Sequence, residues 1–151
     1  MRGAAAPERR KLLHMEAQEL MTTALVTIKP TDTVREALSM MEDQEIRHLP
    51  VVEGKRLAGM VTDRDLREYR LPVVEEIENP EYAEDLLDTK VAEMMNTDVV
   101  TLEPTESIKT AIDLMLEYGV GALPVVDRHK DELVGILSYV DVLRYVRGLL
   151  D

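Results

Sequence analysis

The sequence contains one pattern twice, and this duplication constrains the fold more than any other feature. The string MTTALVTIKPTDTVREALSMMEDQEIRHLPVV, from Met21, aligns without gaps with MNTDVVTLEPTESIKTAIDLMLEYGVGALPVV, from Met95. After a slightly longer hairpin in the second copy, Asp65 aligns with Asp141. Repeated supersecondary units usually bury their apolar faces together, so we expect the copies to pack as a pseudo-two-fold pair. Such a pair has two equivalent clefts, which favours a binding module over a protein with one catalytic centre.

Each copy is predicted to fold as strand, helix, strand, strand and helix, which makes the chain an α/β (α+β) protein. Thr33 and Glu36 have the spacing of a capping box, and Val34, Leu38 and Met41 follow at helical spacing. Short apolar runs bounded by Pro, Gly or polar residues predict the strands. We expect strands at 25–28, 49–52, 56–62, 99–102, 123–126 and 133–138, and helices after Thr33 and at 63–69, 107–118 and 139–149.

An acidic segment separates the copies. Its centre is predicted to be helical, because Asn79 can cap a helix and Pro80 suits the first helical position. The preferred interpretation is a solvated connecting helix, and the alternative is an acidic docking surface. Short helices at 16–21 and 89–95 are expected to lead into the two copies. The predicted organisation is a flexible extension at 1–14, one motif at 15–70, a linker at 71–90 and a second motif at 91–151.

Composition limits the classes of function. The formal net charge of −12 argues against nucleic acid as a partner, because no basic stripe offsets phosphate repulsion. No apolar run approaches the roughly 20 residues that span a bilayer, so no membrane partner is expected. The absence of Cys excludes disulfides and thiolate metal sites and fits a cytoplasmic location. The extension lacks the apolar core of a secretory signal, and Met15 is an alternative start to Met1.

A hydroxyl residue and an Asp recur at the end of the last strand of each copy, as Thr62 with Asp65 and as Ser138 with Asp141. This spacing places the hydroxyl at a helix N-cap and the carboxylate in the first turn, where exposed backbone amides favour an anion. The carboxylate can accept hydrogen bonds from both hydroxyls of a ribose. The same spacing is also that of a capping box, but its recurrence favours a binding site.

A glycine recurs within the last strand of each copy, as Gly59 and Gly135. A glycine there indicates that another backbone or a ligand approaches closely, and a bulge or tight packing is an equal alternative.

The ordered set of motifs resembles the CBS motif, named after cystathionine β-synthase. The pattern is Met-x-Thr-x-Val, a helix, Leu-Pro-Val-Val, and then Gly-x-x-Thr/Ser-x-x-Asp, and it covers about residues 16–149. A tandem pair of such motifs is a Bateman module. The resemblance implies a flat homodimer of two pairs, with adenine nucleotides or their derivatives bound in clefts between the motifs. The acidic linker is longer than is usual in that family.

The resemblance also implies roles for individual residues. Asp65 and Asp141 would bind the ribose hydroxyls, and Thr62 and Ser138 the phosphate. The residues that would surround the base are Leu25, Leu49 and Pro50 in one cleft and Val99, Leu123 and Pro124 in the other, with Thr23 and Thr97 as weaker candidates.

The two predicted clefts differ in charge. Arg47, His48 and Arg64 accompany the first, whereas the aligned positions of the second carry uncharged residues. The first cleft is therefore expected to prefer a phosphate ester, and the second to be empty, weaker or suited to a less charged adenosine derivative. His48 has two interpretations, a phosphate contact or a partly exposed histidine paired with a nearby Glu. His14 and His129 lack metal-ligand spacing, and no metal or catalytic cofactor is expected.

Three functions follow from these features. The first is a stand-alone regulatory sensor that binds AMP, ADP, ATP, S-adenosylmethionine or a dinucleotide, changes its dimer packing and acts on a partner protein that remains unknown. The second is a structural or interaction dimer with degenerate clefts. The third is an enzyme, which the absence of Cys and of any catalytic constellation disfavours.

Overall fold

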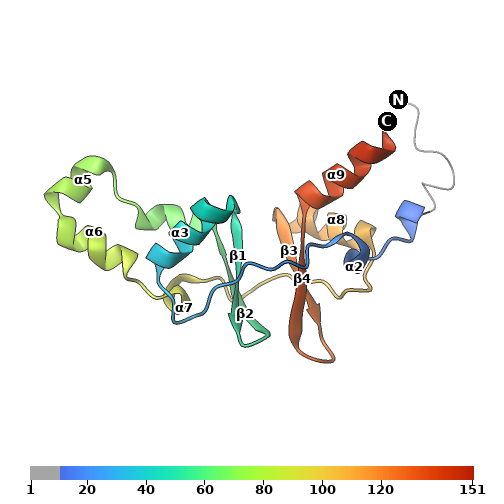
Figure 1. Cartoon of the computed structure of the whole chain (residues 1–151), viewed down its shortest axis with the longest axis horizontal. Helices are drawn as coiled ribbons and strands as arrows, with labels where there is room; N and C mark the ends of the chain where they lie inside the picture. The colour runs from blue at the N-terminus through green and yellow to red at the C-terminus, as the bar shows by residue number, and fades with distance from the viewer. Residues whose placement is uncertain (1–10) are drawn as a thin grey trace. The chain divides into compact units, whose positions relative to one another are not determined.

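The computed structural model describes residues 11–151, which form two compact units (Figure 1). We call residues 26–99 the first-copy unit, and residues 11–25 together with 100–151 the second-copy unit. The chain changes unit after Leu25 and again after Val99, which are aligned positions of the two copies. Each unit therefore takes its leading segment from the start of the other copy.

Both units combine helices with one small antiparallel sheet, so the chain has the predicted α+β fold. The first-copy unit contains α3 (Val34–Gln44), β1 (His48–Glu53), β2 (Arg56–Thr62), α4 (Asp63–Leu66), a 3-10 helix (Arg67–Tyr69), α5 (Val73–Glu78), α6 (Pro80–Leu87) and α7 (Val91–Met94). The second-copy unit contains α2 (Ala17–Leu20), α8 (Ile108–Tyr118), β3 (Ala122–Asp127), β4 (Glu132–Ser138) and α9 (Tyr139–Leu149). In the predicted loose extension, residues 1–10 lie outside the described residues, whereas 11–13 are helical.

The first predicted strand of each copy is in fact a single parallel bridge. Ile28 donates to the Pro50 carbonyl at 3.0 Å and accepts from the Val52 amide at 2.9 Å. Extending this ladder in either direction requires a donor from Pro30 or from Pro50, and proline has no N–H. In the second copy, Leu102 makes the two equivalent hydrogen bonds, and the aligned prolines limit the ladder there in the same way. The two prolines thus limit the predicted strands at 25–28 and 99–102 to one paired residue each.

A segment from the other copy pairs with the outer edge of each hairpin. Met60 on β2 and Asn96 exchange two backbone hydrogen bonds of 2.9 Å. Ile136 on β4 and Thr22 exchange bonds of 3.0 and 2.9 Å. A two-stranded hairpin alone is marginally stable in water, and the added segment pairs the edge that the hairpin leaves open.

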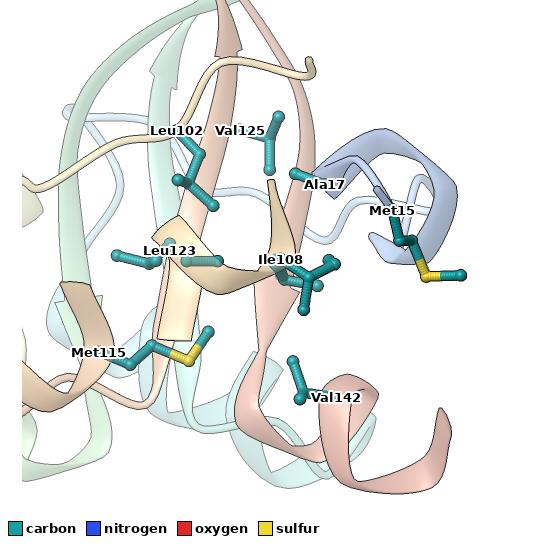
Figure 2. Packing of buried hydrophobic residues seen from close by; sticks show 10 residues of the cluster. Met15, Ala17, Leu102, Ile108, Met115, Leu123, Val125 and Val142 are labelled. Carbon is teal, nitrogen blue, oxygen red and sulfur yellow. The ribbon is translucent and has the colours of Figure 1, made fainter. Parts of the chain in front are cut away.

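Each unit has its own aliphatic core. In the second-copy unit, Ala17 of α2 and Ile108 of α8 pack with Leu123 and Val125 of β3 (Figure 2). In the first-copy unit, Val34 and Ala37 of α3, Val51 of β1 and Val91 of α7 form the equivalent cluster. The short helices α2 and α7 therefore contribute fully buried side chains to cores that are formed mainly by the other copy.

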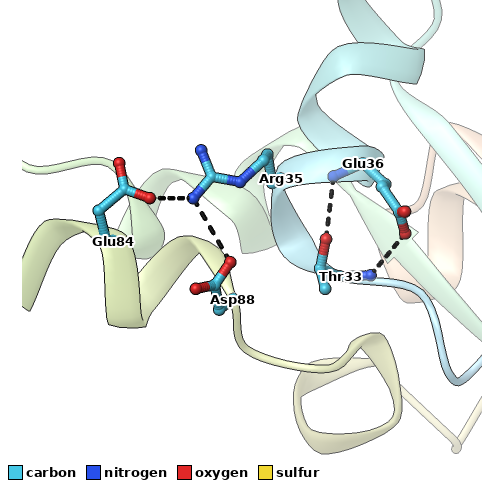
Figure 3. Close-up of polar contacts among 5 residues, drawn as sticks. All are labelled: Thr33, Arg35, Glu36, Glu84 and Asp88. Carbon is cyan, nitrogen blue, oxygen red and sulfur yellow. Dashed lines mark hydrogen bonds and ion pairs between the residues drawn. The ribbon is translucent and has the colours of Figure 1, made fainter.

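The linker forms two helices that α3 anchors. Arg35 on α3 binds the Glu84 carboxylate and reaches Asp88 at 3.4 Å, beside the capping box of Thr33 and Glu36 (Figure 3). Pro80 occupies the first position of α6 as expected, but the side chain of Asn79 makes no capping hydrogen bond. The sequence did not predict α5, whose residues are all exposed.

The glycines of β2 and β4 face the protein's own chain. A Cβ at Gly59 would lie 2.8 Å from Met95 Sδ and 2.9 Å from the Asn96 carbonyl oxygen. A Cβ at Gly135 would collide with the side chain of Met21, 2.8 Å from its Cγ. Close approach of another backbone, one of the sequence-based alternatives, therefore applies to Gly59, whereas Gly135 corresponds to the other alternative, tight packing, here against a side chain.

We expect Gly59→Ala to lower the free energy of unfolding by about 1–3 kcal/mol, because the Asn96 carbonyl cannot move without disturbing its hydrogen bonds with Met60. The matched control is Gly135→Ala, which we expect to cost less, because the flexible Met21 side chain can rotate away. Denaturant unfolding of both variants measures the difference. If both variants lost the same free energy of unfolding, the explanation that Gly59→Ala clashes with the backbone of Asn96 would be contradicted.

Candidate functional site

The hydroxyl and carboxylate at the start of α4 bind each other's backbone. Thr62 Oγ1 accepts from the Asp65 amide at 3.2 Å, and Asp65 Oδ2 accepts from the Thr62 amide at 3.0 Å. Both residues are half-buried. The capping box that the sequence offered as an alternative is thus formed, and it engages one carboxylate oxygen. Among the described residues, nothing donates a hydrogen bond to the other oxygen, Oδ1.

The start of α9 repeats this geometry. Ser138 Oγ accepts from the Asp141 amide at 3.2 Å, and Asp141 Oδ2 accepts from the Ser138 amide at 3.0 Å. These two residues are also half-buried. The equivalent distances show that the duplicated sequence produces a duplicated local structure.

The backbone amides at the two helix starts differ, which corrects the expectation that exposed amides at both would hold a phosphate. At α4, the Asp63 amide donates to the Arg47 carbonyl at 3.0 Å, and the Arg64 amide donates to Asp63 Oδ1 at 2.9 Å. With the capped Asp65 amide, the first three amides of α4 already have acceptors. Any anion at α4 must therefore be bound mainly by side chains.

At α9, the Tyr139 amide donates to the Gly121 carbonyl at 3.0 Å, as the aligned residues of the first copy do. Within residues 11–151, however, the Val140 amide has no acceptor. The difference arises because Asp63, which caps the second amide of α4, is replaced by Tyr139 in the second copy.

Strand pairing places the first copy's cationic residues beside the start of α4. His48 is the register partner of Thr62, and the Arg47 carbonyl accepts from Asp63. Arg64 is exposed on the first turn of α4. In the second copy, the register partner of Ser138 is Ala122. The fold therefore brings the cationic residues of the first copy together at one helix start, and the second copy has no such residues at the aligned positions.

His48 is half-buried, and burial lowers its pKa below the usual histidine value. The carboxylate of Asp63 opposes this effect by raising the pKa, Arg47 lowers it further, and Asp65 raises it. One interpretation of the sequence paired His48 with a Glu. In the structure, the carboxylates that act on His48 are those of Asp63 and Asp65. Sequence reasoning missed Asp63, although an Asp directly after the capping Thr62 was a visible signal.

The apolar residues expected beside a base are less accessible than predicted. Leu49 and Leu123 have no exposed surface and belong to the two cores, so a ligand on this surface touches neither of them. Pro50 and Pro124 are buried as well. Successive residues of a strand point to opposite faces, so the burial of both Leu49 and Pro50, and of both Leu123 and Pro124, means that both faces of β1 and of β3 are covered here.

Leu25 and Val99 are half-buried. Leu25 belongs to the second-copy unit, whereas Thr62 and Asp65 belong to the first-copy unit. Val99 likewise belongs to the first-copy unit, whereas Ser138 and Asp141 belong to the second-copy unit. A role for either residue next to a base stays a prediction.

A hollow of about 450 Å³ lies beside the start of α4, between α3 and α4. Its apolar lining includes Leu38 and Met41 of α3, and its charged rim includes Arg47, Asp63 and Arg67. Thr62, Asp65 and His48 do not line it. The hollow was not foreseen, because it depends on how the two helices pack.

The fold and the repeated helix starts define a protein built from a pair of β-hairpin and helix motifs. The family model for the CBS domain matches residues 17–72 and 91–148. The chain therefore belongs to the CBS domain family and contains two CBS motifs. In residues 11–151, none of the helices is long and apolar enough to cross a membrane.

Known proteins of similar length share this organisation. A CBS domain-containing protein of Bacillus subtilis, YhcV, is 33% identical over 83% of this chain and 81% of its own. The structure of AcuB from Vibrio cholerae, named for acetoin utilization, has a TM-score of 0.74 at 32% identity and covers 91% of this chain and 94% of its own. CBSX2 of Arabidopsis thaliana was also solved in complex with AMP, with a TM-score of 0.74 at 25% identity over 90% of this chain and 98% of its own.

We expect protonation of His48 to destabilise the folded protein. Since its pKa is lowered on folding, the folded state binds fewer protons than the unfolded chain just below the ordinary histidine pKa. The free energy of unfolding should therefore decrease as the pH falls from about 7.5 to about 5.5.

His48→Gln should flatten this part of the stability profile, measured by urea unfolding at several pH values. His129→Gln is the matched control, because His129 is exposed in the hairpin turn between β3 and β4. A profile for His48→Gln as steep as that of His129→Gln would contradict the prediction.

Proposed function

We propose that the protein is a regulatory CBS pair that binds an adenine nucleotide or a related adenosyl ligand and is not an enzyme. The observation that carries the proposal is the duplicated helix start. Asp65 and Asp141 each use one carboxylate oxygen for capping and have a second oxygen without a hydrogen bond in the described part of the chain. A carboxylate oxygen in this state can accept from a ribose hydroxyl without the loss of the cap.

The complex of CBSX2 with AMP supports this class of ligand, because that protein shares the fold and a quarter of the aligned residues. Thr62 and Ser138 are the proposed phosphate contacts. We place the phosphate ester preferentially near Asp65, because Arg47, Arg64 and His48 supply the cationic side chains there. The second copy, whose Val140 amide has no acceptor among the described residues and whose aligned positions carry no cation, suits a less charged adenosine derivative.

We further propose that the ligand acts by changing the packing of a homodimer. The hollow between α3 and α4 has an apolar lining with Arg and acidic residues at its rim. Leu116 on α8 and Leu143 on α9 are exposed apolar side chains. Exposed apolar surface of this kind favours association, and a ligand shifts the dimer only through its different affinities for two arrangements. The regulated partner and a cytoplasmic location stay part of the proposal.

Asp65→Asn is the sharpest test. The Asn side-chain oxygen can still accept from the Thr62 amide, so the cap survives while a charged acceptor is lost. We expect AMP binding near Asp65, measured by calorimetry, to weaken about 10- to 100-fold, because a hydrogen bond to a charged group contributes about 1.5–3 kcal/mol. Asp141→Asn should weaken binding of phosphate esters less. Glu36→Gln, in the capping box of α3, is the control and should bind as the wild type does.

Each alternative function has its own outcome in the same panel of AMP, ADP, ATP and S-adenosylmethionine. Binding of none of them would favour the interaction dimer, for which the occupied capping boxes are the supporting observation. Conversion of any compound to products would favour an enzyme. Tighter binding of phosphate esters by Asp65→Asn than by Asp141→Asn would contradict the assignment of the anion to the first copy.

A further inference from the structure

The helix α5 exposes an apolar stripe that nothing in the described structure covers. Val73, Val74 and Ile77 are 70%, 65% and 74% exposed. Positions 73 and 77 are four residues apart and positions 74 and 77 are three apart, so the three side chains lie on one face of the helix. Half of this six-residue helix is therefore aliphatic and open to water, which is unusual for a surface element.

The rest of the linker holds α5 in place. Leu87 of α6 packs against the core of the first-copy unit, and Glu84 of α6 and the next residue after the helix, Asp88, bind Arg35 of α3. The Asn79 amide donates to the Glu75 carbonyl at 2.8 Å, and the Ala83 amide donates to the Asn79 carbonyl at 3.1 Å. In Figure 1, α5 runs alongside α6, and both helices lie at the end of the first-copy unit opposite the hairpin of β1 and β2. The apolar stripe is therefore exposed on a helix that the rest of the linker holds in place.

Charge selects among the possible occupants of this stripe. Between positions 71 and 88 the sequence has seven carboxylates and no Lys, Arg or His. These carboxylates are Glu75, Glu76, Glu78, Glu81, Glu84, Asp85 and Asp88. Glu75, Glu76 and Glu78 lie on the same helix as the stripe and flank it on both sides. Anionic membranes and nucleic acids are repelled by such a surface, and two copies of α5 facing each other would juxtapose like charges.

We propose that α5 and its carboxylates form a docking site for a basic amphipathic helix of a partner protein. The apolar face of that helix would cover Val73, Val74 and Ile77, and its Lys or Arg residues would contact the flanking glutamates. Apolar contact supplies affinity, and charge complementarity supplies specificity and a faster association. This site lies on the linker, apart from Thr62 and Asp65, and does not depend on nucleotide binding.

The test uses the full chain and a fluorescent helical peptide of Leu and Lys, with its Leu residues on one face. A peptide of the same composition with its sequence scrambled is the probe control. We expect fluorescence anisotropy to show binding of the amphipathic peptide at least about tenfold tighter than binding of the scrambled one. The affinity should fall when salt is raised from about 0.1 to about 1 M, since screening shortens the range of the glutamate charges.

Two double variants, each replacing two exposed apolar residues with Ser, show where the peptide binds. Val73→Ser with Ile77→Ser should weaken peptide binding at least about tenfold. Leu13→Ser with Leu150→Ser removes two exposed apolar side chains outside the linker and should leave peptide binding unchanged. Equal binding of both peptides by the wild type, or wild-type binding by the Val73/Ile77 variant, would overturn the proposal. A dimer, measured by sedimentation, that is lost only in the Val73/Ile77 variant would assign the stripe to a second copy and overturn it as well.

Discussion

The pairing of an outer backbone segment with each hairpin is the interaction on which both units depend. Asn96 pairs with Met60 on β2, and Thr22 pairs with Ile136 on β4. The same segments bring α7 and α2 onto the hairpins, where their first residues are fully buried. Neither copy completes its sheet edge or its core with its own leading segment. Each copy therefore supplies the edge segment and the short helix that the other copy needs. This dependence explains why a single copy of such a motif is a poor folding unit.

This arrangement separates structural requirements from those of binding. The space next to the glycines of β2 and β4 is filled by Met95 with Asn96 and by Met21, so both positions serve packing within the chain. At the helix starts, Asp65 and Asp141 serve a cap with one oxygen, and the second oxygen, which accepts no hydrogen bond within residues 11–151, is the one that the proposed ligand would use. A carboxylate has two acceptor atoms, so stability and ligand recognition are compatible in the same side chain.

The negative charge of the chain is concentrated where its least buried apolar helix lies. The linker supplies seven of the carboxylates in a protein of net charge −12, and α5 is exposed along its whole length. The two CBS motifs are nearly equivalent in backbone geometry, whereas the linker has no counterpart in the second copy. Features that distinguish this chain from a symmetric pair are thus found in the cationic surroundings of Thr62 and in α5.

The sequence by itself determined the duplication, the two hairpins, the helices that follow capping residues and the family, because spacing, capping and turn chemistry act over a few residues. It did not determine α5 or the reduction of the strands at 25–28 and 99–102 to single bridges. Tertiary structure decided which copy each leading segment joins, since the bonds of Thr22 and Asn96 are made to strands distant in sequence. It also decided that Leu49 and Leu123 are core residues and that Asp63 occupies an amide of α4. These outcomes depend on which side of a strand or helix meets a neighbour, and local periodicity does not specify that neighbour.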